Sequence, residues 1–365
     1  MKKKVICFPF VGNNLGGSHY STLELINKLD KRKFDTILVV HKKGYFYKFL
    51  KKKKYKINLL PINKFVGEDK GFFLNLYRIF RLFFPIRNFI NKNNVDIVHA
   101  NDASINLSWV IPSKLSFIKF IWHQRIKFAS EWNLYRLLSF FSDRIICVSN
   151  YVLKGMPSFL KRKSVKIYNP ISLGKIKKDS NLKKKYFSNK NKNILFLGNI
   201  IKRKKIDIFL KAIDLITKNY SSVKCFIVGL DKKSILKNLI KKKRNSNLVN
   251  VGFSDNPFFW LRNCDLILSP AVDEALGRNI VESMLSKIPV IASNSGGNSE
   301  IIKNGSTGWL FEKDNYIDLA KKSIYVLRMN KSKLNKILLD AHTFVSNKYS
   351  VKKHVENIEK IYFKL

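Results

Sequence analysis

Two glutamates, Glu274 and Glu282, stand eight positions apart in the stretch from Asp273 to Ile302. The run "DLILSP" before them is typical of a buried strand, "AVDEALG" of the loop at its carboxyl end, and "RNIVESMLSK" of an amphipathic helix. Gly277 stands at the helix entrance, where free N–H groups and the helix dipole favour a phosphate. Glu274 could then accept hydrogen bonds from nearby hydroxyl groups, and Glu282, deeper along the helix, could accept both hydroxyls of a ribose. The alternative is two ordinary surface acids, because this spacing is common by chance.

Two other strand ends carry residues that could face a ligand. In "NNLGGSHYSTLELINKL", Gly16 and Gly17 would let the backbone approach a phosphate just before a helix entrance. A plain strand-to-helix turn gives the same pattern. In "FIWHQR", an apolar strand ends with His123, which could bind a hydroxyl group. A lone histidine at a strand end is more often structural.

The elements that must position these residues follow one plan. Short apolar runs such as "FDTILVVH", "RIICVS" and "NILFLGN" alternate with helix-length amphipathic segments. This alternation indicates an α/β fold whose parallel sheets are covered by helices on both faces. The alternation of strands and helices begins again after a polar, lysine-rich stretch. We therefore expect two doubly wound, Rossmann-like domains facing a cleft, over 1–172 and 193–345, with a linker over 173–192 and a terminal helix over 346–365 that crosses back.

The composition favours anionic partners. The chain has 365 residues, with 70 Lys and Arg against 25 Asp and Glu, a net charge of +45. Such a charge favours nucleic acid, acidic lipid surfaces or phosphorylated substrates. The basic residues are spread evenly, so a general compositional bias is an alternative explanation. The four cysteines lie in or beside apolar runs without a CxxC motif, which predicts small buried side chains in a reducing compartment rather than disulfides or metal ligands.

The basic and aromatic segment over 46–90 is unusual. In "GFFLNLYRIFRLFFPIRNFI", one helical face is predicted to carry Phe72, Phe73, Leu76, Ile79, Phe80 and Phe83, with arginines interspersed. Such a stretch suits a membrane interface. A helix packed on the sheet as part of the core is the alternative. The N-terminal "MKKKVICFPF" indicates a first strand rather than a signal peptide, and no stretch is long enough to span a membrane. We expect a cytoplasmic protein, peripheral on the inner face of the membrane.

The region around Glu274 resembles the donor-site signature of the GT-B glycosyltransferases of family 4. The matching features are the Glu274–Glu282 pair, "PVIAS", Gly296, Gly297, Glu300 and "NGSTGWLF". The resemblance covers most of the chain. It implies the GT-B fold of two Rossmann-like domains and transfer of a sugar from a nucleotide-sugar with retention of configuration.

The resemblance also implies roles for individual residues. Glu274 and His123 would be catalytic. "LGNIIKRKKIDIFLKAI" resembles the segment in which an arginine and a lysine bind the donor diphosphate. Lys204 takes the lysine position and Asn199 the arginine position, so either Arg203 or Lys202 would have to compensate. The donor-binding set implied in this way is Gly17, Asn199, Arg203, Lys204, Leu276, Gly277, Arg278 and Glu282.

The implied partners are a nucleotide-sugar donor, with UDP-sugar favoured over GDP-sugar, and a saccharide or polyprenyl-diphosphate-linked acceptor. The product would be a cell-surface polysaccharide such as capsule or lipopolysaccharide. We expect no cofactor and no metal, because no Asp-x-Asp motif follows a strand. Lysine, backbone N–H groups and a helix dipole would stabilise the charge on the leaving diphosphate. A covalent role for Glu274, as in retaining glycosidases, is less favoured because no partner carboxylic acid stands out.

Two other classes of protein fit parts of the sequence. A sugar-nucleotide epimerase or hydrolase on the same fold would need a base for proton abstraction and no acceptor. A nucleic-acid-binding protein would explain the charge, would bind duplexes in a salt-dependent way, and would leave Glu274 and Glu282 without a role. We therefore expect no nucleic-acid partner.

Overall fold

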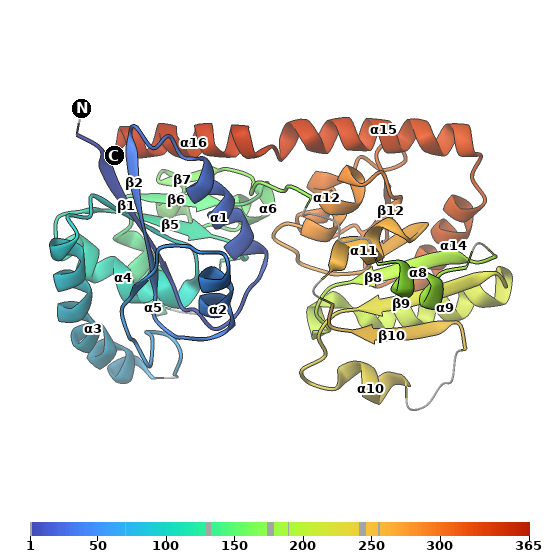
Figure 1. Cartoon of the computed structure of the whole chain (residues 1–365), viewed down its shortest axis with the longest axis horizontal. Helices are drawn as coiled ribbons and strands as arrows, with labels where there is room; N and C mark the ends of the chain where they lie inside the picture. Colours follow the sequence, from blue (N-terminus) through green and yellow to red (C-terminus); the bar gives the residue numbers. More distant parts are fainter. Residues whose placement is uncertain are drawn as a thin grey trace. The chain divides into compact units, whose positions relative to one another are not determined.

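The computed structural model describes residues 2–69, 71–128, 133–173, 179–188, 190–240, 246–254 and 256–365. The chain forms two compact units. The first unit comprises 1–170 together with 351–365, and the second comprises 171–350. Each contains a parallel sheet between helices, which confirms the predicted α/β class (Figure 1). None of the helices in the described ranges is both long and apolar enough to cross a membrane.

The first unit has a seven-stranded sheet in the order β3-β2-β1-β4-β5-β6-β7. Its strands are β1 (Lys4–Phe10), β2 (Phe34–Val40), β3 (Asn58–Leu59), β4 (Ile97–Ala100), β5 (Lys119–Gln124), β6 (Arg144–Cys147) and β7 (Ser164–Lys166). Its helices are α1 (Gly17–Lys28), α2 (Tyr45–Lys52), α3 (Phe72–Lys92), α4 (Ala103–Leu115), α5 (Asn133–Phe140), α6 (Asn150–Lys154), α7 (Ser158–Lys161) and α16 (Val351–Lys364).

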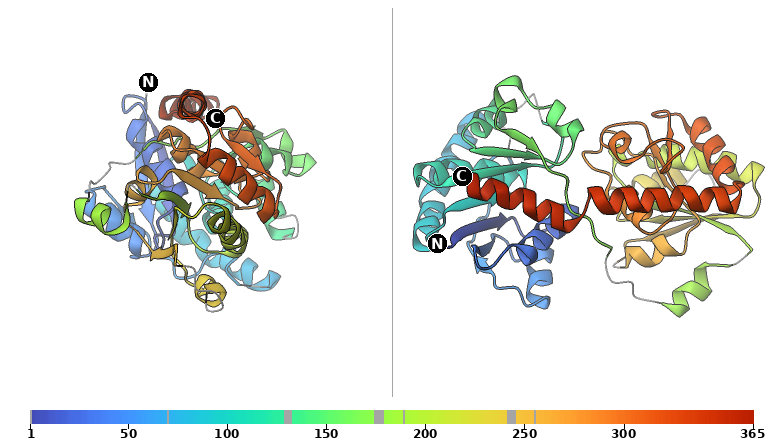
Figure 2. Two further views of the ribbon diagram at one scale, coloured as in Figure 1. Left: turned by 90° about the vertical axis from the view of Figure 1, so that its right-hand side faces the viewer. Right: turned by 90° about the horizontal axis from the view of Figure 1, so that it is seen from above.

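One face of this sheet is covered by α1, α2 and α16. Alternate strand residues point to opposite faces, and Ile6, Phe8 and Phe10 of β1 pack with side chains of these three helices in one buried cluster. Helix α16 contacts α1, and Lys4 Nζ donates to the backbone oxygen of Tyr362 at 2.8 Å. Both ends of the chain therefore lie in the first unit (Figure 2). The contacts of α3 with α4, and of α4 with α5, form a second helical layer.

The aromatic helix α3 matches the alternative expectation of a core helix only in its C-terminal half, where Leu82, Ile86 and Ile90 are buried and the helix packs against α4. Its buried residues are Asn75, Arg78, Leu82, Ile86 and Ile90. Four residues of the predicted apolar stripe, Phe72, Phe73, Leu76 and Phe80, are exposed instead. Helical spacing alone identifies a stripe, but it does not say which side of the helix faces the sheet.

The second unit has a six-stranded parallel sheet in the order β10-β9-β8-β11-β12-β13. Its strands are β8 (Lys192–Leu197), β9 (Val223–Val228), β10 (Leu248–Gly252), β11 (Leu266–Ser269), β12 (Val290–Ser293) and β13 (Trp309–Phe311). Its helices are α8 (Ser180–Tyr186), the 3-10 helix η1 (Lys202–Lys204), α9 (Ile206–Asn219), α10 (Ile235–Ile240), α11 (Pro257–Arg262), α12 (Arg278–Leu285), α13 (Asn298–Ile301), α14 (Tyr316–Leu327) and α15 (Lys331–Lys348).

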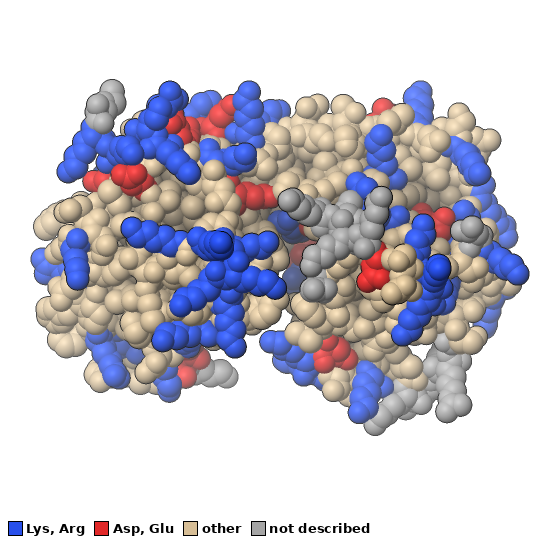
Figure 3. Space-filling view, in the orientation of Figure 1, with Lys and Arg blue, Asp and Glu red and all other residues tan. Residues whose placement is uncertain are grey.

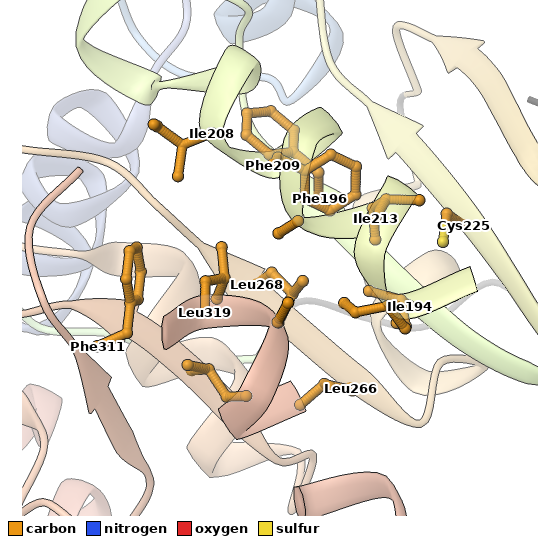
Figure 4. Close-up of a cluster of buried hydrophobic side chains, with 14 of the residues drawn as sticks. Ile194, Phe196, Ile208, Phe209, Ile213, Cys225, Leu266, Leu268, Phe311 and Leu319 are labelled. Atoms are coloured by element: carbon orange, nitrogen blue, oxygen red, sulfur yellow. The ribbon is translucent and has the colours of Figure 1, made fainter. Parts of the chain in front are cut away.

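The core of the second unit lies between the sheet and helices α9 and α14. Phe196 of β8 packs on Phe209 of α9, with Leu268 of β11 and Leu319 of α14 in the same buried cluster (Figure 4). This packing holds the carboxyl ends of β8 and β11 side by side, since the two strands pair in parallel. The loops that carry the predicted donor residues leave from these two strand ends.

The observed division of the chain differs from the predicted boundaries. The units divide after 170 and after 350, whereas the sequence predicts 172 and 345 with a linker over 173–192. Part of that segment forms α8. The rings of Tyr186 and Phe187 pack against Trp260 and Phe226, so these residues belong to the second unit. Two aromatic anchors in a lysine-rich stretch give too little periodicity to predict this packing.

The four cysteines, Cys7, Cys147, Cys225 and Cys264, are all buried and free, as small apolar core residues would be. Burial raises the pKa of each thiol, to about 12 for Cys147. The thiols are therefore protonated at neutral pH.

Candidate functional site

The loop between β11 and α12 holds Glu274 in a fixed backbone position. Asp273 adopts a left-handed conformation, with φ of 51°, and its N–H donates to Ser295 Oγ at 3.1 Å. The backbone oxygen of Glu274 accepts from Gly297 N–H at 2.6 Å. The loop is thus tied to the turn that follows β12, and the Gly-Gly pair of the sequence lies directly against it.

Gly296 and Gly297 are glycines because of this close approach. Gly296 has φ of 60°, and a Cβ atom there would lie 2.7 Å from the oxygen of Glu274. A Cβ atom on Gly297 would lie 2.5 Å from the oxygen of Ala275. Any side chain would push the Glu274 loop away, so both glycines help to position this carboxylate.

Two cations converge on the Glu274 carboxylate. Arg203 Nη1 lies 2.7 Å from Oε2, and Lys204 Nζ forms an ion pair with Oε1. The backbone N–H of Val272 donates to the oxygen of Arg203 at 3.0 Å, which links the 3-10 turn η1 to the β11 loop. Burial opposes ionisation of Glu274, but Lys204 and Arg203 outweigh it and hold its pKa below the ordinary value. The site therefore contains an ionised carboxylate and two cations.

Glu282 has a different environment on α12. Its Oε1 accepts from Arg278 Nε at 2.7 Å, one helical turn away. Burial raises the pKa of Glu282 above its ordinary value, although Arg278 and Lys204 favour the ionised form. The two glutamates of one loop and helix are thus shifted in opposite directions, a pattern typical of carboxylates with distinct roles.

The start of α12 is joined to the ends of both neighbouring strands. Gly277 precedes the first helical residue, and Leu276 is the residue before it. The side-chain amide of Asn279 donates to the backbone oxygen of Leu197 on β8 at 3.2 Å and lies 3.3 Å from Ser269 Oγ on β11. Sequence reasoning missed Asn279, and the only signal was its place in the first turn of the predicted helix.

Asn199 has a structural contact at the end of β8. Its Oδ1 accepts from the backbone N–H of Leu230 at 3.4 Å, which links the loops after β8 and β9. It lies in the same unit as Arg203, Lys204 and the α12 residues. The guanidinium of Arg203, predicted to compensate for Asn199, is the group that reaches Glu274.

His123 and Gly17 belong to the first unit. Gly17 is the first residue of α1. His123 is buried at the carboxyl end of β5, and its Nδ1 lies 3.0 Å from Nε2 of His99 and 3.4 Å from Nη2 of Arg125. Nδ1 of His99 in turn lies 2.6 Å from Tyr362 Oη on α16. Burial, and then Arg125, lower the pKa of His123 well below its ordinary value.

Arg125 is the centre of a polar cluster that sequence reasoning missed. Its Nη2 donates to Asn101 Oδ1 at 2.6 Å and to Thr22 Oγ1 at 3.1 Å, and its Nη1 donates to Asn169 Oδ1 at 2.8 Å. These partners follow β4 and β7 or lie on α1, so all of them sit near one edge of the sheet. The one available signal in the sequence was that Arg125 stands two positions after His123. Its partners are too distant in sequence for the pattern to indicate that they bind it.

The structure therefore gathers Glu274, Arg203 and Lys204 into one cluster and places Glu282 and Arg278 beside it on α12. Ligands of open α/β sheets bind at the carboxyl ends of strands. A carboxylate with two cations at that edge suits a ligand that is both anionic and rich in hydroxyl groups. Sheets, loops and site together define a two-domain α/β protein with a candidate site for such a ligand at the carboxyl ends of the strands in its second unit.

Comparisons with known proteins show which class of protein this is. Residues 177–338 match the family model described as glycosyl transferases group 1, and 15–175 match the model of glycosyltransferase family 4. The chain belongs to this family of GT-B glycosyltransferases and is a glycosyltransferase.

Among its relatives, an uncharacterized glycosyltransferase of Methanocaldococcus jannaschii is 28% identical over 84% of either chain. The capsular polysaccharide biosynthesis glycosyltransferase CapH of Staphylococcus aureus is 23% identical over 79% of this chain and 81% of its own length.

Solved structures show the same fold over the whole chain. HepE of Anabaena, in complex with UDP and glucose, has a TM-score of 0.82 and 18% identity over 99% of both chains. A glycosyltransferase from Rickettsia africae has a TM-score of 0.83 and 23% identity over 100% of this chain and 99% of its own. A putative UDP-N-acetylglucosamine 2-epimerase from Listeria monocytogenes shares the fold at a TM-score of 0.69, 15% identity and similar coverage, 100% and 97%. The fold alone does not separate transferases from epimerases, but the family matches do.

Proposed function

We propose that this glycosyltransferase transfers a sugar from a nucleotide-diphosphate sugar, with UDP-sugar favoured over GDP-sugar, to a saccharide or polyprenyl-diphosphate-linked acceptor. The observation that carries the proposal is the convergence of Arg203 and Lys204 on Glu274 beside the entrance of α12. HepE was solved with UDP and glucose, and CapH and other relatives act in capsular polysaccharide biosynthesis, which supports a role in surface polysaccharide synthesis.

The cations would act on the leaving group. As the bond between sugar and diphosphate breaks, negative charge grows on the β-phosphate, and Lys204, Arg203 and the N–H groups at the start of α12 can stabilise it. These groups supply positive charge of the kind that a metal ion provides in other transferases, so we propose that no metal or other cofactor is required. Glu274 keeps both cations in place before the donor binds.

Retention of configuration would follow from attack on the same face that the diphosphate leaves. Both oxygens of Glu274 are engaged by cations, which makes this carboxylate a weak nucleophile. In the proposed step the acceptor hydroxyl bonds to the anomeric carbon, the bond to the diphosphate breaks, and the departing phosphate oxygen takes the hydroxyl proton. The anomeric configuration of the product, read by NMR, distinguishes retention from inversion, and a search for a glycosyl adduct on Glu274 by mass spectrometry distinguishes this step from a covalent one.

The acceptor side is proposed to work at an anionic membrane surface. A polyprenyl-diphosphate carrier lies in the membrane, and the chain carries a net charge of +45. Attraction of basic residues to anionic lipid contributes about 1 kcal/mol for each residue near the surface. The enzyme would then be peripheral on the inner face of the cytoplasmic membrane.

Donor binding is tested by thermal shift with UDP-, GDP-, ADP- and TDP-sugars. A ligand that binds only the folded protein raises its melting temperature. We expect one nucleotide class to stabilise the wild type, and UDP-sugars are the favoured class. The stabilisation should be lost in Glu282→Ala and reduced in Lys204→Ala, because a lost hydrogen bond to a charged group weakens binding roughly tenfold to a hundredfold.

Two control variants in the same unit separate these effects from general damage. Lys205 is the neighbour of Lys204 but pairs with Asp314 at 2.8 Å, so Lys205→Ala should keep the donor response. Asp318 forms an i,i+4 pair with Lys322 on α14, so Asp318→Ala removes a paired helical carboxylate elsewhere. A wild type that no nucleotide-sugar stabilises, or a response equal in all four variants, contradicts the proposed donor site.

A further inference from the structure

Helix α3 exposes a continuous apolar face. We define the outer face of α3 as the large side chains that are exposed on it: Phe72, Phe73, Leu74, Leu76, Tyr77, Phe80 and Phe84. Phe73 is 83% exposed and Phe80 is 68% exposed. Scattered single apolar residues are normal on a protein surface, but a contiguous patch of this kind marks an interaction site.

The opposite side of the same half of α3 is polar and firmly attached. Arg78 is buried, donates to the backbone oxygen of Phe65 at 3.1 Å and forms an ion pair with Asp69. Asn75 is also buried: its Oδ1 accepts from Gly67 N–H at 2.7 Å and its amide donates to the oxygen of Gly71 at 2.7 Å. These bonds fix the rotation of the helix, so the aromatic residues are held outward by the fold.

The charge around the patch selects its partner. Apart from the buried Arg78, which pairs with Asp69, helix α3 contains Arg81, Arg87 and Lys92 and no acidic residue. A second copy of a chain with a net charge of +45 would bring like charges together. An anionic lipid surface attracts the cations and accepts the aromatic rings at its headgroup boundary. In Figure 3, Lys and Arg side chains gather over α2 of the first unit, whereas the surface over α3 is largely uncharged.

We propose that the outer face of α3 inserts into the headgroup region of an anionic membrane and anchors the first unit there. The aromatic side chains supply the apolar contact, and the basic residues of the first unit supply the attraction. The inference rests on the proposed function in one respect only, because that function places the enzyme at a membrane surface. The helix lies on the membrane and does not span it.

Vesicle co-sedimentation of the full chain tests the anchor. The probe is a vesicle of phosphatidylcholine and phosphatidylglycerol in equal parts, with pure phosphatidylcholine as the neutral reference. We expect wild type to bind the anionic vesicles and Phe73→Ser/Phe80→Ser to bind them roughly tenfold or more weakly, since two buried aromatic contacts are lost. Binding should also weaken at high salt.

A matched control removes two exposed apolar side chains of the second unit. Phe253 is 60% exposed and Ile317 is 46% exposed. Phe253→Ser/Ile317→Ser should bind vesicles as the wild type does. Equal binding by the wild type and the α3 variant overturns the proposal. So does a wild-type dimer that the α3 variant dissociates, measured by light scattering, because the face then contacts a second copy.

The same variant separates this inference from the proposed function. Phe73→Ser/Phe80→Ser leaves the residues around Glu274 unchanged, so its thermal response to the nucleotide-sugar should match the wild type. Lost vesicle binding with an intact donor response supports both proposals. If the variant loses vesicle binding but even the wild type shows no thermal response to a nucleotide-sugar, the result supports the anchor and not the proposed donor site.

Discussion

The position of the proton on His123 follows from its neighbours. A guanidinium group can only donate hydrogen bonds, so the Nδ1 atom of His123, 3.4 Å from Arg125 Nη2, must accept. Nε2–H of His99 can donate to the same atom at 3.0 Å, while Tyr362 O–H donates to Nδ1 of His99. A neutral His123 then carries its proton on Nε2, the ring nitrogen that has no hydrogen-bond partner among the described residues. We therefore expect His123 to donate a hydrogen bond to a ligand oxygen rather than to act as a base.

We predict that His123 remains neutral, with Nε2 protonated, as the pH falls through 6.5, because burial and Arg125 hold its pKa well below the ordinary value. Nitrogen-15 NMR of histidine-labelled protein distinguishes protonated from bare ring nitrogens, and His123→Gln assigns the signal. Tyr362→Phe serves as the control, since it should change the signals of His99 more than those of His123. A proton on Nδ1 of His123, or titration near pH 6.5, would show the assignment to be wrong.

At the scale of the element, the turn after β12 packs against the Glu274 loop and fixes its position. We predict that Gly296→Ala destabilises the protein by about 2–4 kcal/mol: roughly 1–2 for the left-handed backbone and more for the forced shift of the loop. Gly305→Ala is the matched control, because Gly305 also has a positive φ, 77°, but a Cβ atom there meets nothing within 4 Å. Urea unfolding measures both.

Donor-induced stabilisation distinguishes the two glycine variants further. Gly296→Ala should weaken the response to the nucleotide-sugar, because the backbone of Glu274 must move, whereas Gly305→Ala should keep it. Equal loss of stability in both variants would mean that backbone strain alone explains the effect and that the contact with Glu274 is unimportant.

The same elements show how far sequence reasoning reaches. The alternation of strands and helices predicted the two sheets, and the order strand, loop, helix placed Glu274 before α12 correctly. The ion pairs of Glu274 with Arg203 and Lys204 join separate strand ends, and only the pairing of β8 with β11 brings those ends together. The orientation of α3 was not predictable from helical spacing, because buried Asn75 and Arg78 are satisfied by a loop whose path the sequence pattern does not reveal.

At the scale of the whole molecule, the histidines are distributed unevenly. All of them except His342 lie in the first unit. Burial lowers the pKa of His41 and of His354 from 6.5 to about 4, and it lowers those of His99 and His123 as well. The folded first unit therefore holds these rings neutral, whereas the unfolded chain would protonate them below about pH 6.5.

The lowered pKa values of these histidines determine how the stability of the fold depends on pH. A base whose pKa is lowered by folding contributes stability that is fully present above its unfolded pKa and is lost as the pH falls from about 6.5 toward 4. A shift of one pKa unit corresponds to about 1.4 kcal/mol, so His41 and His354 each contribute up to roughly 3 kcal/mol of pH-dependent stability. We predict that mild acid destabilises the first unit more than the second.

The buried cysteines allow each unit to be followed separately. Cys7 and Cys147 report on the first unit, and Cys225 and Cys264 on the second. Urea unfolding at pH 7 and pH 5 is followed by labelling with a dipyridyl disulfide, which reacts with thiols in mild acid, and by mass spectrometry of the peptides. The urea midpoints of Cys7 and Cys147 should fall more at pH 5 than those of Cys225 and Cys264.

The variant His41→Phe should reduce that pH-dependent difference. It should also lower stability at both pH values, because Trp109 Nε1–H, which donates to His41 at 3.1 Å, loses its acceptor. An equal shift of all four cysteines would show that the buried histidines do not govern the acid response, and the carboxylates of both units would then have to explain it.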